Sequence, residues 1–237
     1  MSSPTPVCLI TGGSSGIGLA TARRFACGGH HVVICGRDWQ RLQTARKSIT
    51  AQAPAAEVEA VVADLGDPAA PDRVARHCQQ TLGRVDVLVN NAAIASVAPV
   101  DQISDELIDQ MIDVNVRGVY RMTRAVWPTM QQQQHGVIVN ISSLAALDPF
   151  PGFSLYGATK AWLELLTSAL AGEGREHGIR VYGVRPGVVE TPLLRGLFPE
   201  FPAEQTVSAE HVADMVWLVC QNEMVHSSGQ IIQLTRQ

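Results

Sequence analysis

The chain has 237 residues, of which 46% are apolar, and a formal net charge of −4 at pH 7. It is too apolar and too weakly charged to be intrinsically disordered. The slight acidity argues against binding to nucleic acid or to an anionic membrane, because both attract basic proteins. Composition therefore predicts a globular protein, with neither nucleic acid nor membrane among its partners.

The cysteines, the histidines and the first residues bear on cellular location and on metal binding. Five scattered cysteines include no Cys-x-x-Cys pair, and the histidines show no His-Glu-x-x-His spacing. The chain opens without the basic and apolar stretches of a secretory signal, and no run of about 18 apolar residues could span a membrane. We expect free thiols, no metal ion and a cytoplasmic location.

In chain order, seven short apolar segments alternate with longer segments of helical periodicity. We expect strands at residues 7–11, 31–36, 58–63, 85–90, 136–142, 179–184 and 230–234. Most are apolar throughout, as in parallel strands that are covered on both faces. We expect helices at residues 16–28, 38–51, 71–82, 104–128, 155–177 and 209–221. The alternation predicts one α/β domain over residues 1–237, with a doubly wound parallel sheet between two helical layers.

One low-complexity tract, Gln131–Gln134, follows Pro128 near the end of a predicted helix. Proline and polar tracts both favour helix ends and connections. We therefore expect this tract to form a surface loop.

The first predicted strand leads into a glycine-rich turn, Thr11-Gly12-Gly13-Ser14-Ser15-Gly16-Ile17-Gly18, within which a helix begins. Glycines allow a sharp turn and a close approach to a ligand, and a helix N-terminus offers free N–H groups to a pyrophosphate. Since ligands of doubly wound sheets bind beyond the carboxyl ends of the strands, this turn predicts a dinucleotide site.

The same residues also satisfy Gly-x-Ser-x-Gly, the nucleophile turn of serine hydrolases, with Ser14 as the nucleophile. Asp214 or Glu223, together with His226, would then complete a triad. No HGGG-type oxyanion segment is present, and no strand precedes the first one to support the oxyanion hole. The hydrolase interpretation is the weaker alternative.

The end of the second predicted strand bears on the choice of cofactor. An acidic residue about 20 positions after the glycines would bind the adenosine ribose, whereas a basic one favours a 2′-phosphate. Here Gly36 ends the strand, and Arg37 and Asp38 follow. This pattern favours NADP(H), with NAD(H) as the alternative, although Arg37 could be a solvated charge and Asp38 a helix N-cap.

Ser143, Tyr156 and Lys160 form a candidate catalytic set. Tyr156 and Lys160 are four residues apart in a predicted helix, so their side chains lie on the same face. A cation about 4 Å away, at an effective dielectric near 20, favours the phenolate by about 4 kcal/mol, or about three pKa units. We therefore expect Lys160 to bring Tyr156 near the working range of a general acid–base, with Ser143 binding the substrate oxygen.

These motifs, in this order and at this spacing, resemble the short-chain dehydrogenase/reductase family along the whole chain. The resemblance implies a Rossmann-type seven-stranded sheet and a cofactor site made of Thr11, Gly12, Ser14, Ser15, Gly16, Ile17, Gly18, Arg37, Asp64, Leu65, Asn91, Ala92, Ala93, Tyr156, Lys160, Pro186, Gly187, Val189 and Thr191. The Tyr-x-x-x-Lys spacing is similar to that of the family's ketoreductases, which favours ketone or aldehyde and alcohol chemistry.

The resemblance also implies a role for each catalytic residue. Tyr156 would exchange a proton with the substrate oxygen, and Ser143 would orient the substrate. Lys160 would bind the nicotinamide ribose and lower the pKa of the tyrosine, and Asn115 would hold a water in a proton relay. Ala93 departs from the family's usual glycine, which would strain the alanine if that glycine has a positive φ.

The segments after the fourth, fifth and sixth predicted strands supply an apolar substrate wall: Ile94, Leu144, Phe150, Phe153, Leu193, Leu194, Leu197 and Phe198, with Arg195 as the nearby cation. We expect an apolar or aromatic carbonyl or alcohol as substrate, and a mobile lid at about residues 191–206. The helix after Phe153 carries Trp162 and Leu165, and since the family often pairs this helix, we expect a homodimer or homotetramer. A non-catalytic dinucleotide-binding protein is a further alternative.

Overall fold

The computed structural model describes residues 4–236 and contains a seven-stranded parallel sheet. Its order is β3-β2-β1-β4-β5-β6-β7, so the chain winds outward from β1 in one direction and then from β4 in the other. The predicted doubly wound sheet is confirmed. Its strands are β1 (Val7–Thr11), β2 (His31–Gly36), β3 (Val58–Val62), β4 (Val87–Asn90), β5 (Gly136–Ile141), β6 (Ile179–Pro186) and β7 (Ile231–Leu234).

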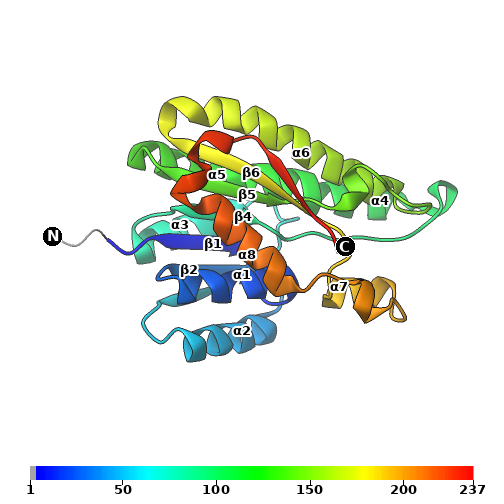
Figure 1. The fold of residues 1–237 in the computed structure, drawn as a ribbon, viewed down its shortest axis with the longest axis horizontal. Coiled ribbons are helices and arrows are strands. Elements are labelled where there is room, and N and C mark those ends of the chain that lie inside the picture. The colour runs from blue at the N-terminus through cyan, green and yellow to red at the C-terminus, as the bar shows by residue number, and fades with distance from the viewer. Residues whose placement is uncertain (1–3, 237) are drawn as a thin grey trace.

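Helices cover both faces of the sheet (Figure 1). One face packs against α1 (Gly16–Cys27), α2 (Trp39–Gln52) and α8 (Ala209–Cys220), and the other against α3 (Ala70–Leu82), α5 (Val119–Gln133) and α6 (Ser154–Gly174). Successive residues of a strand point to opposite faces, so each face needs its own apolar set. Thus Cys8 and Ile10 belong to the first core, and Val7 and Leu9 to the second.

The expectation of one continuous helix over residues 104–128 is wrong, because the helix is interrupted and extends beyond residue 128. The segment consists of α4 (Asp105–Ile112), a π-helical turn (Asp113–Gly118) and α5. The wider turn accompanies the burial of Asn115, whose side chain is bound by other parts of the chain. π turns of this kind are frequent at functional sites.

The glutamine tract is also mostly helical rather than a loop, because α5 continues past Pro128 to Gln133. Met130 is fully buried in the core, and the Gln133 side chain accepts a hydrogen bond from Val85 N (3.0 Å) and donates one to Val85 O (2.8 Å). These contacts offset the donor that proline removes. They also explain why β4 begins at Val87 rather than at Val85, since the main-chain groups of Val85 are bound by a side chain.

Among residues 4–236, no helix is long and apolar enough to cross a membrane. The five cysteines are all free thiols. Within the same residues, no group of three or more His, Cys, Asp or Glu side chains is arranged to hold a metal ion.

We predict that Gln133→Ala lowers the melting temperature by several degrees, because it leaves the buried N–H and C=O of Val85 without partners, at a cost of about 1–3 kcal/mol. Gln132→Ala is the matched control, since this neighbouring side chain is exposed. Thermal unfolding followed by circular dichroism measures both variants. Equal melting temperatures for the two would contradict this account of the tract.

Candidate active site

A cleft of about 910 Å³ lies at the carboxyl edge of the sheet. It is lined by the glycine turn after β1, by the ends of β4 and β5 and by α7 (Pro192–Leu197), whose first residue lies beside Gly16 of the glycine turn. Because all strands run in one direction, their carboxyl ends meet here, on the right in Figure 1. The topology thus brings segments that are distant in sequence into one site.

The glycine turn is fixed to the end of β4 by Thr11 and Asn91. The Thr11 hydroxyl accepts hydrogen bonds from the main-chain N–H groups of Asn91 and Ala92, both at 3.0 Å. In return, Asn91 Nδ2 donates to the carbonyls of Thr11 (2.9 Å) and Gly12 (3.2 Å). Gly12 has a φ of +66°, and a Cβ on Gly18 would lie 2.3 Å from the Gly12 carbonyl oxygen. Both positions therefore require glycine.

The N-terminus of α1 is suited to an anionic ligand. Its N-cap residue, Ser15, makes no side-chain capping hydrogen bond, and the first turn of the helix contains no acidic residue. The first N–H groups of the helix are thus left to a ligand, with the positive end of the helix dipole behind them. Ser14, Ser15 and Gly16 line the cleft at this point, which fits a pyrophosphate.

Two arginines lie where the cleft meets the end of β2. Arg37 and Arg41 are both exposed and both line the cleft, near Ser14 and Gly36. Asp38 is the N-cap of α2, and its carboxylate accepts a hydrogen bond from Arg41 N at 3.0 Å. The alternative role for Asp38 as a helix N-cap is therefore confirmed. Arg41 was missed in the sequence, although its spacing of four residues from Arg37 was a usable signal.

Ser143, Tyr156 and Lys160 lie together at the other end of the cleft. Ser143 follows β5, whereas the other two are on the first two turns of α6 and are almost fully buried. Lys160 Nζ donates a hydrogen bond to the Ile141 carbonyl (2.8 Å) and is 5.6 Å from the centroid of the Tyr156 ring. Serine, phenol and ammonium groups are thus juxtaposed, as a proton-transfer site requires.

The expected fall in the pKa of Tyr156 is not what the structure shows. Burial raises the pKa of its phenol to about 12, and the Ser143 hydroxyl offsets this only in part. Burial also lowers the pKa of the Lys160 ammonium to about 8. The expectation failed because spacing reveals proximity but not desolvation, which penalises both charged groups here.

Asn115 lies behind the cleft rather than in its wall. Its Oδ1 accepts a hydrogen bond from Ile94 N (2.9 Å), and its Nδ2 donates to Ile94 O (2.9 Å) and to Thr159 Oγ1 (3.2 Å). The side chain thereby fixes the segment after β4 to α6. Its expected role in holding a water stays a prediction.

Ala93 is not strained by its departure from glycine. Among residues 4–236, Gln134 is the only non-glycine residue with a positive φ. The main chain at Ala93 therefore needs no left-handed conformation, and the alanine is accommodated beside the cleft.

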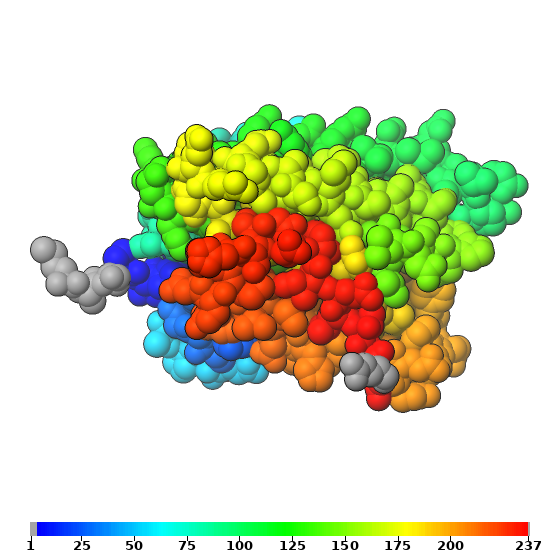
Figure 2. Space-filling view, turned by 45° about the horizontal axis from the view of Figure 1, so that its top comes forward, coloured from blue at the N-terminus to red at the C-terminus, as the bar shows by residue number. Residues whose placement is uncertain are grey.

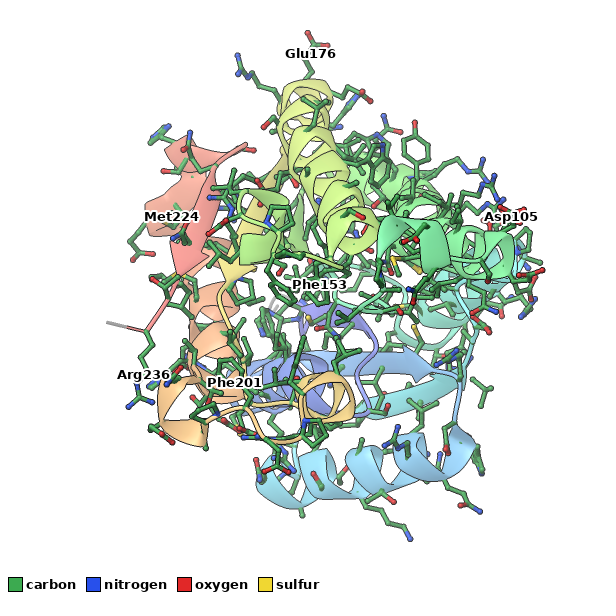
Figure 3. The ribbon with its side chains drawn as sticks, turned by 90° about the vertical axis from the view of Figure 1, so that its right-hand side faces the viewer. Asp105, Phe153, Glu176, Phe201, Met224 and Arg236 are labelled. Carbon is green, nitrogen blue, oxygen red and sulfur yellow. The ribbon has the colours of Figure 1, made fainter. Side chains whose placement is uncertain are left out.

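Aromatic rings form the wall near α7. Phe150 and Phe153 stack with centroids 4.3 Å apart, and Phe198, which directly follows α7, approaches Phe150 to 5.7 Å. Figure 3 shows Phe153 at the start of α6, above the segment that carries Phe201. Arg195 does not line the cleft; its guanidinium pairs with Glu190 and donates to the carbonyls of Pro199 and Phe201.

Most predicted site residues line this one cleft, including all eight of the substrate wall. Thr11, Gly18 and Asn115 lie beneath it and support it. Besides Arg41, the sequence interpretation missed Asp148, which also lines the cleft, as does Phe201 within the expected lid. In Figure 2 the segment around α7 (orange) and the green segment after β5 meet at one end of the molecule.

The geometry gives no support to a hydrolase with Ser14 as nucleophile. Among the described residues, no histidine lines the cleft that contains Ser14. Asp214, one of the proposed acids, instead pairs with Arg24 at 2.9 Å.

Comparison with known proteins identifies the class. A sequence model described as short chain dehydrogenase matches residues 6–200. The chain therefore belongs to the short-chain dehydrogenase/reductase family, and it is an oxidoreductase of that family.

Individual relatives agree over nearly the whole chain. The chain is 35% identical to 3-oxoacyl-(acyl-carrier-protein) reductase FabG of Thermotoga maritima, an alignment that covers 95% of this chain and 94% of the relative. A 3-ketoacyl-(acyl-carrier-protein) reductase from Brucella melitensis, solved with NADH, superposes with a TM-score of 0.90 at 33% identity and covers 98% of both chains. L-Sorbose reductase from Gluconobacter frateurii, solved with NADPH and L-sorbose, gives a TM-score of 0.90 at 28% identity, covering 99% of this chain and 97% of that one.

The lowered pKa of Lys160 predicts a pH dependence of stability. In the unfolded chain, the pKa of this lysine is near 10.5. Between about pH 8 and pH 10.5 the unfolded chain therefore binds more protons than the folded chain. The free energy of unfolding consequently rises with pH over this range. We predict that the parental chain gains about 2 kcal/mol relative to Lys160→Met between pH 8 and pH 10. Urea unfolding measures the difference. Relative to Lys47→Met, at an exposed position, the parental chain should gain no stability over this pH range. If the free energy of unfolding of Lys160→Met and of Lys47→Met depended on pH in the same way, the lowered pKa of Lys160 would be refuted.

Proposed function

We propose that this protein is an NADP(H)-dependent reductase that interconverts a small ketone or aldehyde with the corresponding alcohol. The observation that carries the proposal is the juxtaposition of Ser143, Tyr156 and Lys160 at one end of a cleft whose other end suits a dinucleotide. The family membership supports oxidoreductase chemistry, and the Tyr-x-x-x-Lys spacing favours carbonyl substrates.

The glycine turn and the edge of the sheet would hold the cofactor. The pyrophosphate would bind at the N-terminus of α1, with Ser14, Ser15 and Ile17, while Asp64 and Leu65 would contact the adenosine. The nicotinamide end would be surrounded by residues from the ends of β4 and β6 and from α6: Asn91, Ala92, Ala93, Lys160, Pro186, Gly187, Val189 and Thr191. When bound, NADPH supplies the hydride for the carbonyl carbon.

NADP(H) is favoured over NAD(H) because two guanidinium groups, those of Arg37 and Arg41, are exposed at the adenosine end. A 2′-phosphate would accept charge-assisted hydrogen bonds from both. Asp38, the nearest carboxylate in sequence, caps α2 by accepting a hydrogen bond from Arg41 N through its Oδ1. The structural relatives were solved with NADH in one case and NADPH in another, so family membership alone leaves the choice open.

Tyr156 would serve as the proton donor to the carbonyl oxygen. With a pKa near 12, its phenol is fully protonated at neutral pH and is therefore ready to donate. Ser143 would hydrogen-bond the same oxygen as negative charge develops on it. Lys160, buried beside the ring, would then stabilise the resulting phenolate, since opposite charges attract strongly in a site of low dielectric.

An apolar or aromatic carbonyl compound is the substrate class that fits the wall. Phe150, Phe153 and Phe198 would contact it, together with Ile94, Leu144, Leu193, Leu194 and Leu197. Arg195 is engaged with Glu190 and with main-chain carbonyls, so it offers no free cation to a carboxylate or phosphate. Residues 191–206 would act as a lid over this end.

Assembly into a homodimer or homotetramer and a cytoplasmic location belong to the same proposal. The former is supported by Leu165, which lies on α6 with 72% of its surface exposed. The free state of all five thiols agrees with a reducing compartment.

Replacing Tyr156 with phenylalanine tests the reaction. We predict that Tyr156→Phe reduces NADPH oxidation with a panel of apolar ketones by about a thousandfold or more, because it removes the proton donor, while NADPH binding by fluorescence titration stays near the parental value. Tyr120→Phe, at a half-exposed position on α5, should leave turnover unchanged. Substantial residual activity in Tyr156→Phe would exclude the mechanism, and a parental chain active only on an ester panel would favour the hydrolase.

Arg37→Ala tests the cofactor preference. Loss of a charge-assisted hydrogen bond of about 1.5–3 kcal/mol should raise KM for NADPH about ten- to a hundredfold, with little change in KM for NADH. Arg46→Ala, on the outer surface of α2, is the control, since Arg46 does not line the cleft. If KM rises equally for both cofactors, the assignment of the 2′-phosphate to Arg37 is wrong.

A further inference from the structure

Glu164 of α6 and Arg185 of β6 form a nearly buried ion pair behind the cleft. Arg185 Nε lies 2.8 Å from Glu164 Oε1, and Arg185 Nη2 lies 2.5 Å from Glu164 Oε2. The two side chains are only 12% and 13% exposed. The proton-transfer chemistry proposed above gives neither residue a role.

The carboxylate also binds the segment that carries Ser143. Ser142 Oγ donates a hydrogen bond of 2.6 Å to Glu164 Oε1, and Ser142 directly precedes Ser143. On the other side, Arg185 directly precedes Pro186 and Gly187, which line the cleft, and its Nη1 donates to Gln233 of β7 at 3.2 Å. One carboxylate therefore connects α6 to the ends of β5, β6 and β7.

Glu164 works together with Lys160, one helical turn earlier. Residues four apart lie on the same face of a helix. Lys160 Nζ holds the carbonyl of Ile141, and Glu164 holds the hydroxyl of Ser142, the next residue along the chain. Two successive turns of α6 thus hold two successive residues of the chain that leads to Ser143. Tyr156 is one turn before Lys160 on the same helix.

We infer that Glu164 is a positioning residue for the reaction: through Ser142 and Arg185 it sets where Ser143 and the Pro186-Gly187 segment lie relative to Tyr156. The inference rests on the proposed function, because the distance between Ser143 and Tyr156 matters only if both residues act on the same substrate oxygen. The competing explanation is that the pair only stabilises the fold.

Glu164→Gln is the direct test. It keeps the size of the side chain and removes the charge that holds Ser142 and Arg185. We expect kcat for ketone reduction to fall about ten- to a hundredfold with KM for NADPH within about twofold, because displacements of about 1 Å in a catalytic group have effects of this size. Hydrogen–deuterium exchange of the protein alone should become faster in peptides covering residues 142–147 and 186–189.

Asp86→Asn is the matched control. Asp86 also forms a bidentate pair, with Arg84 at 2.6 and 2.7 Å, but it lies before β4, at the opposite edge of the sheet. We expect this variant to lower the melting temperature, while kcat and the exchange of residues 142–147 stay at parental values.

Glu164→Leu combined with Arg185→Met separates positioning from stability. Replacing a buried ion pair with apolar residues is often neutral for stability. We expect the double variant to regain most of the melting temperature lost in Glu164→Gln but not its kcat or its slow exchange. Recovery of kcat together with stability, or unchanged exchange in Glu164→Gln, would overturn the inference. If the parental chain reduced no ketone, the proposed function would fail, and the exchange measurement would still show whether Glu164 holds the segments that carry Ser143 and Pro186.

Discussion

Thr11 and Asn91 join the ends of β1 and β4, and the dinucleotide end of the cleft depends on this contact. The two strands are neighbours at the point where the winding of the sheet reverses, so the chain leaves them in opposite directions and opens a crevice. Main-chain groups exposed at such a point need partners. The Thr11 hydroxyl and the Asn91 amide satisfy them and also hold the glycine turn against the sheet, which leaves the first N–H groups of α1 directed at the cleft.

At the other end of the cleft, burial determines the properties of the proposed catalytic residues. α6 packs so closely on β5 and β6 that Tyr156 and Lys160 are almost inaccessible, and this desolvation moves both pKa values toward the uncharged forms. This environment keeps the Tyr156 phenol protonated, as the proposed proton donation to a carbonyl oxygen requires. The pair Glu164 and Arg185 extends the same packing to the ends of three strands.

Aromatic contacts line the wall around α7, and main-chain hydrogen bonds between Val207 and the pair Val188 and Glu190 hold the base of this segment. Phe198 meets Phe150 and Phe153 across the cleft, while Arg195 binds the segment together from within. Figure 2 shows how this segment and the one after β5 close one end of the molecule. The aromatic contacts lie outside the seven-stranded sheet, as the lid proposed for residues 191–206 requires.

The sequence by itself determined the strands, the sheet class and most of the residues around the cleft. Continuous apolar runs such as that of β1 are typical of strands covered on both faces, and glycine at positions 12 and 18 follows from steric limits at this turn. Helix ends were less predictable: the contacts of Gln133 with Val85, 48 residues away, carry α5 past Pro128. Only the tertiary structure decided the protonation of Tyr156, the position of Asn115 behind the cleft and the network of Glu164. Each depends on burial or on partners distant in the chain, which spacing along a sequence does not reveal.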